Sequence, residues 1–100
     1  MHVTLKTMEK LDDLLDEADE YVTCATAHTD DHDLKSAYLD LARCHYDGYE
    51  KLAKIAERSV ERKASAGGEK AQVVREMAQW HLDKFADRAS KIKMRLDQVR

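Results

Sequence analysis

The sequence predicts an all-α protein in which three long amphipathic helices run antiparallel to one another, in an up-down-up bundle. The 100 residues contain no proline and only three glycines, whereas β-sheets need frequent turns that use those residues. Good helix formers such as Ala, Leu, Lys and Glu are abundant. Apolar side chains recur every three or four positions in three separate blocks, which is the helical period. A chain of this length forms a single helical domain, residues 1–100.

The first helix is predicted over about residues 3–27. Six side chains at helical spacing form its apolar face: Met8, Leu11, Leu15, Ala18, Val22 and Ala25. Leu14 and Tyr21 widen this face, and the acidic side chains of the segment lie largely off it.

The HTDDHD segment, residues 28–33, interrupts the pattern before a second helix predicted over about residues 31–65. Thr29, Asp30 and Asp31 are each suitable N-caps for that helix. Because the break holds no Gly or Pro, one continuous helix is the alternative. The apolar face of the second helix is expected at Leu34, Tyr38, Leu41, His45, Tyr49, Leu52, Ile55 or Ala56, and Val60. The helix ends at SAGG, where we expect Gly67 to adopt the left-handed conformation.

The third helix is predicted over about residues 69–99. Its apolar face is expected at Val74, Ala78, His81, Phe85, Ala89, Ile92, Leu96 and Val99. Met77, Trp80 and Leu82 flank this face. The apolar faces are wider than three helices can cover, and pairing with a second copy would bury more of them, so we expect a homodimer.

The net charge of −3 is unevenly distributed along the chain. Residues 1–50 hold 4 Lys/Arg and 13 Asp/Glu, whereas residues 51–100 hold 13 and 7. We expect an acidic first helix to lie against a basic later one, because such attraction helps to select the packing register. The alternative is a basic face for nucleic acid, but acidic residues interrupt every basic stretch and no aromatic platform accompanies them.

The sequence also predicts where in the cell the protein is located. No apolar run approaches the roughly 18–20 residues that cross a bilayer, and MHVTLKTMEK lacks the apolar stretch of a signal peptide. We therefore expect a cytoplasmic protein without a membrane partner. Cys24 and Cys44 make no disulfide framework, and the predicted register keeps them too far apart for a bond.

Histidines are the distinctive chemical feature. His28 and His32, spaced i, i+4 among aspartates, could bind a transition metal on one helical face. If a helix boundary separates them, they belong to a polar turn that binds Zn or Ni only adventitiously. His45 and His81 lie on predicted apolar faces. Such a histidine is either a neutral side chain with one hydrogen-bond partner or a metal ligand or pH-sensitive contact.

The predicted turns set which residues lie level across the bundle. A first turn centred near residues 30–31 places His45 beside Asp16 and Glu17, so we expect a Glu17–His45 contact. A second turn centred near residue 67 sets His45 and His81 roughly 12 Å out of register, which prevents them from sharing one metal. The sequence contains no nucleophile–base–orienter triad, complete P-loop, CxxC or HExxH motif, so we expect no enzyme of the usual hydrolytic or transfer classes.

Three segments, DEADEYVTCA (16–25), YLDLARCHYDGYEKLAKIAERSVER (38–62) and REMAQWHLDKFADRASKIKMRL (75–96), resemble ferritin-like, rubrerythrin-like proteins. They are similar to small three-helix members of gut bacteria and their phages. The resemblance implies a di-iron site with one Glu on the first helix and Glu-x-x-His on the second. Glu17 matches the first Glu, but His45 and Gly48 stand where the motif has Glu and His. The resemblance therefore implies a related fold whose metal site is lost.

The sequence thus favours a non-catalytic interaction or scaffold protein that forms a homodimer. The alternative is a ferritin-like protein that binds Fe, Mn or Zn through Glu17 and His45, with further ligands from a second subunit. A nucleic-acid accessory protein that uses the basic second half is a third interpretation.

Overall fold

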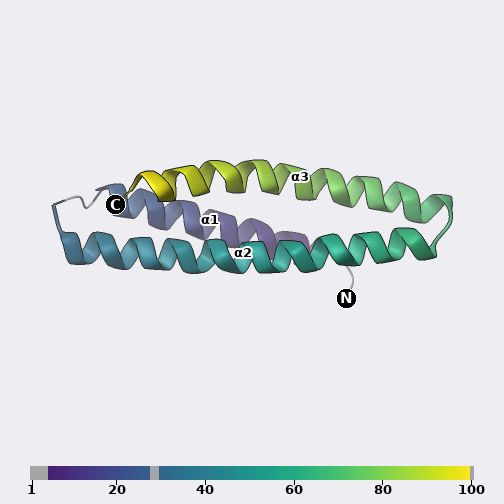
Figure 1. Ribbon diagram of the computed structural model, residues 1–100, viewed down its shortest axis with the longest axis horizontal. Coiled ribbons are helices and arrows are strands. Elements are labelled where there is room, and N and C mark those ends of the chain that lie inside the picture. Colours follow the sequence, from purple (N-terminus) through teal and green to yellow (C-terminus); the bar gives the residue numbers. More distant parts are fainter. Residues whose placement is uncertain (1–4, 28–29, 100) are drawn as a thin grey trace.

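The computed structural model describes residues 5–27 and 30–99 and contains three α-helices (Figure 1). They are α1 (Leu5–Ala27), α2 (His32–Ala66) and α3 (Glu69–Gln98). The chain reverses direction after α1 and again after α2, so α1 and α3 run parallel and α2 runs antiparallel to both. The bundle is a rod of 57 × 19 × 16 Å. The predicted all-α, three-helix fold is confirmed.

The break between α1 and α2 is confirmed, and its cap is Asp31. This residue has extended backbone angles, and its Oδ1 accepts a hydrogen bond of 3.0 Å from the Leu34 amide. The bond satisfies one of the amide groups that a helix leaves unpaired in its first turn. Because α2 returns along α1 from this point, one continuous helix through the segment is excluded.

The turn between α2 and α3 uses Gly67 for a different reason from the one predicted. Gly67 is extended, with φ −112° and ψ 176°, so the expected left-handed conformation is wrong. A Cβ atom on Gly67 would lie only 2.2 Å from the Cβ of Ala71 in the first turn of α3. Glycine is therefore needed because α3 approaches the backbone here, and the reversal is made by extended residues.

The core lies along the axis of the bundle, and it confirms the predicted face of α1 closely. Five of its six predicted residues, from Leu11 to Ala25, are fully buried, and Met8 packs against them. α2 and α3 contribute Leu39, Ala42, Tyr46, Tyr49, Ala56, Val60, Leu82, Ala89, Ile92 and Leu96. The single domain therefore has one continuous core.

The predicted face of α2 is partly wrong. Leu34 and Leu41 are exposed, whereas Leu39 and Ala42, which were not predicted, are buried. Of the two alternatives Ile55 and Ala56, Ala56 is the buried one. The reason is that α2 packs against both other helices, so its buried face is centred between them. The predicted apolar face is instead displaced toward the edge of α2 that borders α1.

α1 is shorter than its neighbours and covers only part of them (Figure 1). The ion pairs Asp12–Arg88 and Asp19–Arg95 each join residues 76 positions apart. Because α1 and α3 are parallel, this constant offset sets Leu5 level with His81. No described residue of α1 therefore lies beside α3 from Glu69 to Trp80. Among the described residues, this part of the rod, called here the hairpin end, consists of α2 and α3 alone.

Two further expectations concern the described helices. None of them is both long and apolar enough to cross a membrane. Cys24 is half-buried and Cys44 is exposed, and both are free thiols.

Candidate functional site

The predicted Glu17–His45 contact is present at the edge where α1 packs against α2. Glu17 Oε2 lies 2.7 Å from His45 Nε2, and both residues are partly buried. His45 Nδ1 lies 2.8 Å from the carbonyl oxygen of Leu41, one turn earlier in α2. A carbonyl oxygen only accepts hydrogen bonds, so Nδ1 carries a proton and donates it. The ring is therefore oriented by its own helix and presents Nε2 to Glu17.

This pair permits two kinds of chemistry. Both ring nitrogens face acceptors, so an imidazolium ion would donate one hydrogen bond to each. A metal ion in place of the Nε2 proton would find His45 already oriented, as metal-bound histidines commonly are. Within residues 5–27 and 30–99, however, no three His, Cys, Asp or Glu side chains come together as a metal site. Metal binding by Glu17 and His45 stays a prediction.

Two tyrosines accompany this pair, and sequence reasoning placed them only on apolar faces. The ring centroid of Tyr21 lies 5.3 Å from that of His45 and 6.2 Å from that of Tyr38, with the two phenol rings stacked. Tyr21 therefore contacts the imidazole ring, and Tyr38 stacks on Tyr21. The i, i+4 spacing of Glu17 and Tyr21 was the signal that could have placed Tyr21 beside His45.

Besides His45, the described histidines are His32 and His81, and neither belongs to a cluster of three possible metal ligands among the described residues. His32 is exposed, and its Nδ1 lies 3.9 Å from Asp33. His28 lies outside the described residues, so the expected His28–His32 pair is not tested. His81 is exposed and does not lie on the buried face of α3, which corrects that prediction. Its ring instead lies edge-on to Trp80, with 5.0 Å between centroids.

The acidic first helix lies against the basic third helix, as the charge distribution predicts. Arg88 forms ion pairs with Asp12, at 2.9 Å, and with Asp16. Arg95 pairs with Asp19 one turn further along α1. All of these groups are partly exposed, so each bond contributes modestly to stability. Two arginines of the basic half are thus paired with aspartates of α1 at the surface of the bundle.

The hairpin end carries most of the large exposed apolar side chains of α3. Val73 is 55% exposed, Met77 62% and Trp80 58%, and we call these three residues the apolar ridge. Their spacing of four and three residues places them on one outward stripe of the helix. Lys84 Nζ lies 5.3 Å from the centre of the Trp80 ring, but the rest of the ridge faces solvent. Met77 and Trp80 were predicted to flank the apolar face of the third helix, whereas Val73 was not singled out.

A groove lies beside the ridge, between α2 and α3. Its volume is about 220 Å³. Seven residues line it, and together we call them the hairpin groove: Val60, Lys63, Lys70, Ala71, Val74, Arg75 and Ala78. Val60 is buried, whereas Val74 is 62% exposed. The lining surface is therefore mostly apolar, and its charged members are Lys63, Lys70 and Arg75.

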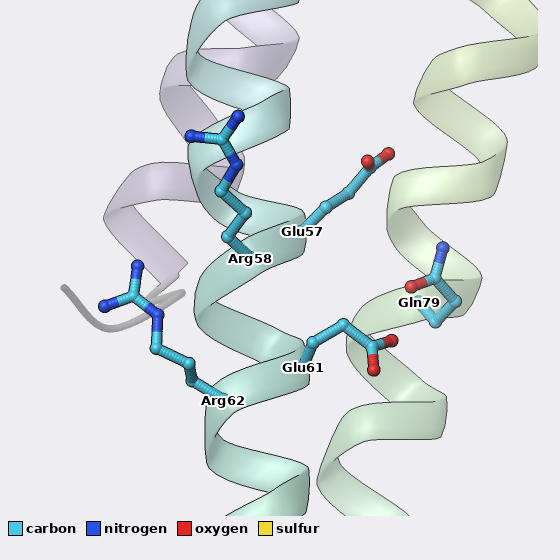
Figure 2. Close-up of a pocket in the computed structure, with 5 residues that line it drawn as sticks. All are labelled: Glu57, Arg58, Glu61, Arg62 and Gln79. Carbon is cyan, nitrogen blue, oxygen red and sulfur yellow. The ribbon is translucent and has the colours of Figure 1, made fainter.

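A different face of the hairpin end is polar (Figure 2). Glu57 and Glu61 project from α2 toward α3 and Gln79, while Arg58 and Arg62 project away from α3. Glu61 Oε1 accepts a hydrogen bond of 2.9 Å from Arg75 Nη2. This ion pair joins α2 to α3 in the part of the rod where no described residue of α1 lies beside α3. The face holds charged residues in solvent but no enclosed pocket for chemistry.

The comparisons add no relative to this description. No protein-family model, no curated protein and no solved structure matches the chain. Function is therefore argued from the surface and the geometry of the described residues.

Proposed function

We propose that the protein is a non-catalytic helical interaction protein that forms a homodimer through its apolar ridge. The exposure of Val73, Met77 and Trp80 on one stripe of α3 is the observation that carries this proposal. Contiguous exposed apolar surface on a small protein is typical of protein–protein contacts. Large side chains such as Trp and Met are enriched at such interfaces.

The charges beside the ridge favour a second copy as the occupant. With the ridge as the contact stripe, Glu76 lies on one flank and His81 on the other, five residues apart. In a parallel pairing of two α3 helices, these positions face each other across the interface, as g and e′ positions do in a parallel coiled coil. Each dimer would therefore form two Glu76–His81 contacts, one on each side of its two-fold axis.

The molar mass in solution tests this proposal. We expect a dimer from sedimentation equilibrium, and we expect Met77→Glu to give a monomer because it places a carboxylate in an apolar contact. Met94→Glu is the matched control, because Met94 is equally exposed at 60% on the same helix but lies away from the hairpin end. It should leave the dimer intact.

The charge contacts have their own test. Glu76→Lys should weaken the dimer, and the double variant Glu76→Lys, His81→Glu should restore it. A wild-type protein that stays monomeric at about 1 mM would overturn the homodimer. Equal loss of the dimer in the Met77→Glu and Met94→Glu variants would overturn the ridge as its interface.

A second candidate is metal binding, and the Glu17–His45 contact is the observation that favours it. The pair supplies two ligands of the kinds that Fe, Mn and Zn accept, and a second subunit would have to complete the site. The test is the metal content of protein purified without a histidine tag. Stoichiometric metal that is lost in His45→Ala would establish this function, and metal-free protein after dialysis against each ion would exclude it.

A further inference from the structure

The surface of α3 that faces α1 continues along α3 past the residue where α1 begins. Arg88 and Arg95, which hold the α1 carboxylates, lie seven residues apart on one line of α3. Residues spaced by seven stay on the same helical face, so His81 and Val74 continue this line into the hairpin end. Because α1 begins level with His81, no described residue of α1 covers this continuation.

The surface of α2 that faces α1 also continues into the hairpin end. His45 marks the line of α2 that faces α1, because it contacts Glu17. Lys63 follows His45 by 18 residues, which is five full helical turns, so it lies on the same line. The hairpin groove therefore has both of its walls on the side of the rod that α1 occupies elsewhere.

The charges of the groove resemble those that α1 meets. Lys63 and Lys70 border an apolar lining formed by Val60, Ala71 and Ala78. Over the part of the chain that the structure describes, neither lysine forms an ion pair. Where α1 is present, its carboxylates pair with Arg88 and Arg95 of α3, whereas no described residue of α1 lies beside Lys63 and Lys70.

We propose that the hairpin groove binds an acidic amphipathic helix of a partner protein. The partner helix would continue the position of α1, with apolar residues at i, i+3 and i+7 over Val74 and carboxylates toward Lys63 and Lys70. The available length of α3, from Glu69 to Trp80, is about 18 Å, or three helical turns. This inference rests on the proposed role as an interaction protein, but it does not require the homodimer.

A synthetic peptide of residues 5–27 is the probe, because it has the apolar stripe and the aspartates that α3 already accepts from α1. Trp80 is the only tryptophan of the chain and the peptide has none, so its fluorescence reports binding at the hairpin end. We expect saturable binding to the full-length protein that weakens at raised salt. The double variant Lys63→Glu, Lys70→Glu should weaken binding by about tenfold or more.

Two matched controls define the result. Lys54→Glu, Lys91→Glu makes the same charge change at exposed lysines outside the groove and should bind the peptide as the wild type does. A peptide in which Asp12, Asp16 and Asp19 are replaced by Lys should not bind. The circular dichroism of each variant checks that its helices are intact.

Three outcomes would overturn the inference. The first is no binding at about 1 mM peptide. The second is equal binding to the wild type and to the Lys63→Glu, Lys70→Glu variant. The peptide would then bind outside the hairpin groove, by displacing α1 from its own position. The third is loss of a dimer in that variant without any peptide binding, which would assign the groove to a second copy. Molar mass measured on the same samples separates these results from failure of the homodimer.

Discussion

Glu17 and His45 connect α1 to α2 through a contact of 2.7 Å between Oε2 and Nε2. The imidazole is held at its other nitrogen by Leu41 of the same helix. The two residues come from different helices, and the contact therefore reports directly on how α1 and α2 are aligned along the rod.

We expect this contact to stabilise the protein by about 0.5–1 kcal/mol, because both side chains are partly exposed and solvent screens them. The coupling free energy should be measured by a double-mutant cycle with Glu17→Gln and His45→Leu, using urea unfolding at neutral pH. If His45→Leu is neutral or stabilising in the presence of Glu17, the histidine only packs and the contact contributes nothing.

Gly67→Ala should destabilise the protein by about 1–3 kcal/mol, because the new Cβ would overlap Ala71 at 2.2 Å. Gly68→Ala is the matched control, since a Cβ at Gly68 meets no atom within 4 Å. It should be neutral or stabilising, because alanine restricts the unfolded chain. Thermal unfolding of the two variants checks the difference, and equal melting temperatures would contradict it.

The arginine contacts between α1 and α3 should matter more than a pair within one helix. We expect Arg88→Ala to cost about 1–2 kcal/mol, because Arg88 bridges two aspartates of another helix and also loses packing. Lys91→Ala removes the exposed Lys91–Asp87 pair of 3.6 Å and should cost less than about 0.5 kcal/mol. Denaturant midpoints of the two variants, at low and high salt, test this order.

The buried phenol of Tyr46 predicts sensitivity to alkali. Burial, together with the hydrogen bond and charge of Glu50, raises the pKa of Tyr46 to about 12. Burial also raises the pKa of Tyr49. A folded-state pKa above the unfolded value of about 10 gives stability that is present below pH 10 and is lost as the pH rises toward 12.

The expected loss from Tyr46 is at most about 2–3 kcal/mol over that pH range. Tyr46→Phe should therefore reduce the fall in melting temperature between pH 8 and pH 11, while Tyr38→Phe, at a half-buried tyrosine, serves as the control. A fall that is equally steep in Tyr46→Phe and in the wild type would show that this phenol is not responsible.

The sequence was sufficient for the helices and for the contact between α1 and α2. Periodicity located the buried face of α1, and the position of the Asp31 turn fixed which residue His45 would meet. The same reasoning failed for Leu41, Val74 and His81, which lie at helical spacing with core residues and yet are exposed. For Leu41 the reason is that periodicity does not locate the centre of a face that packs against two helices. For Val74 and His81 the reason is that periodicity does not give the length of the helix that covers the face, and α1 begins only level with His81.

The conformation of Gly67 also could not be predicted, because it depends on how the helices pack. A glycine at the end of a helix permits a left-handed turn, and the same residue also permits close approach of another chain segment. Only the position of Ala71 distinguishes the two, and that position depends on how α3 packs. The apolar ridge, likewise, was visible as Met77 and Trp80 in the sequence, but its exposure follows from the tertiary offset between α1 and α3.

The short first helix also has a dynamic consequence. Backbone amides near Ala42 and Ala89 lie among three helices, whereas those near Val60 and Val74 lie in a two-helix segment with fewer buried apolar neighbours. Regions with less buried surface open locally at lower free energy. Amide hydrogen exchange in the isolated protein should therefore be slowest around the three-helix segment and progressively faster toward Gly67, and opening of the rod should begin at that tip.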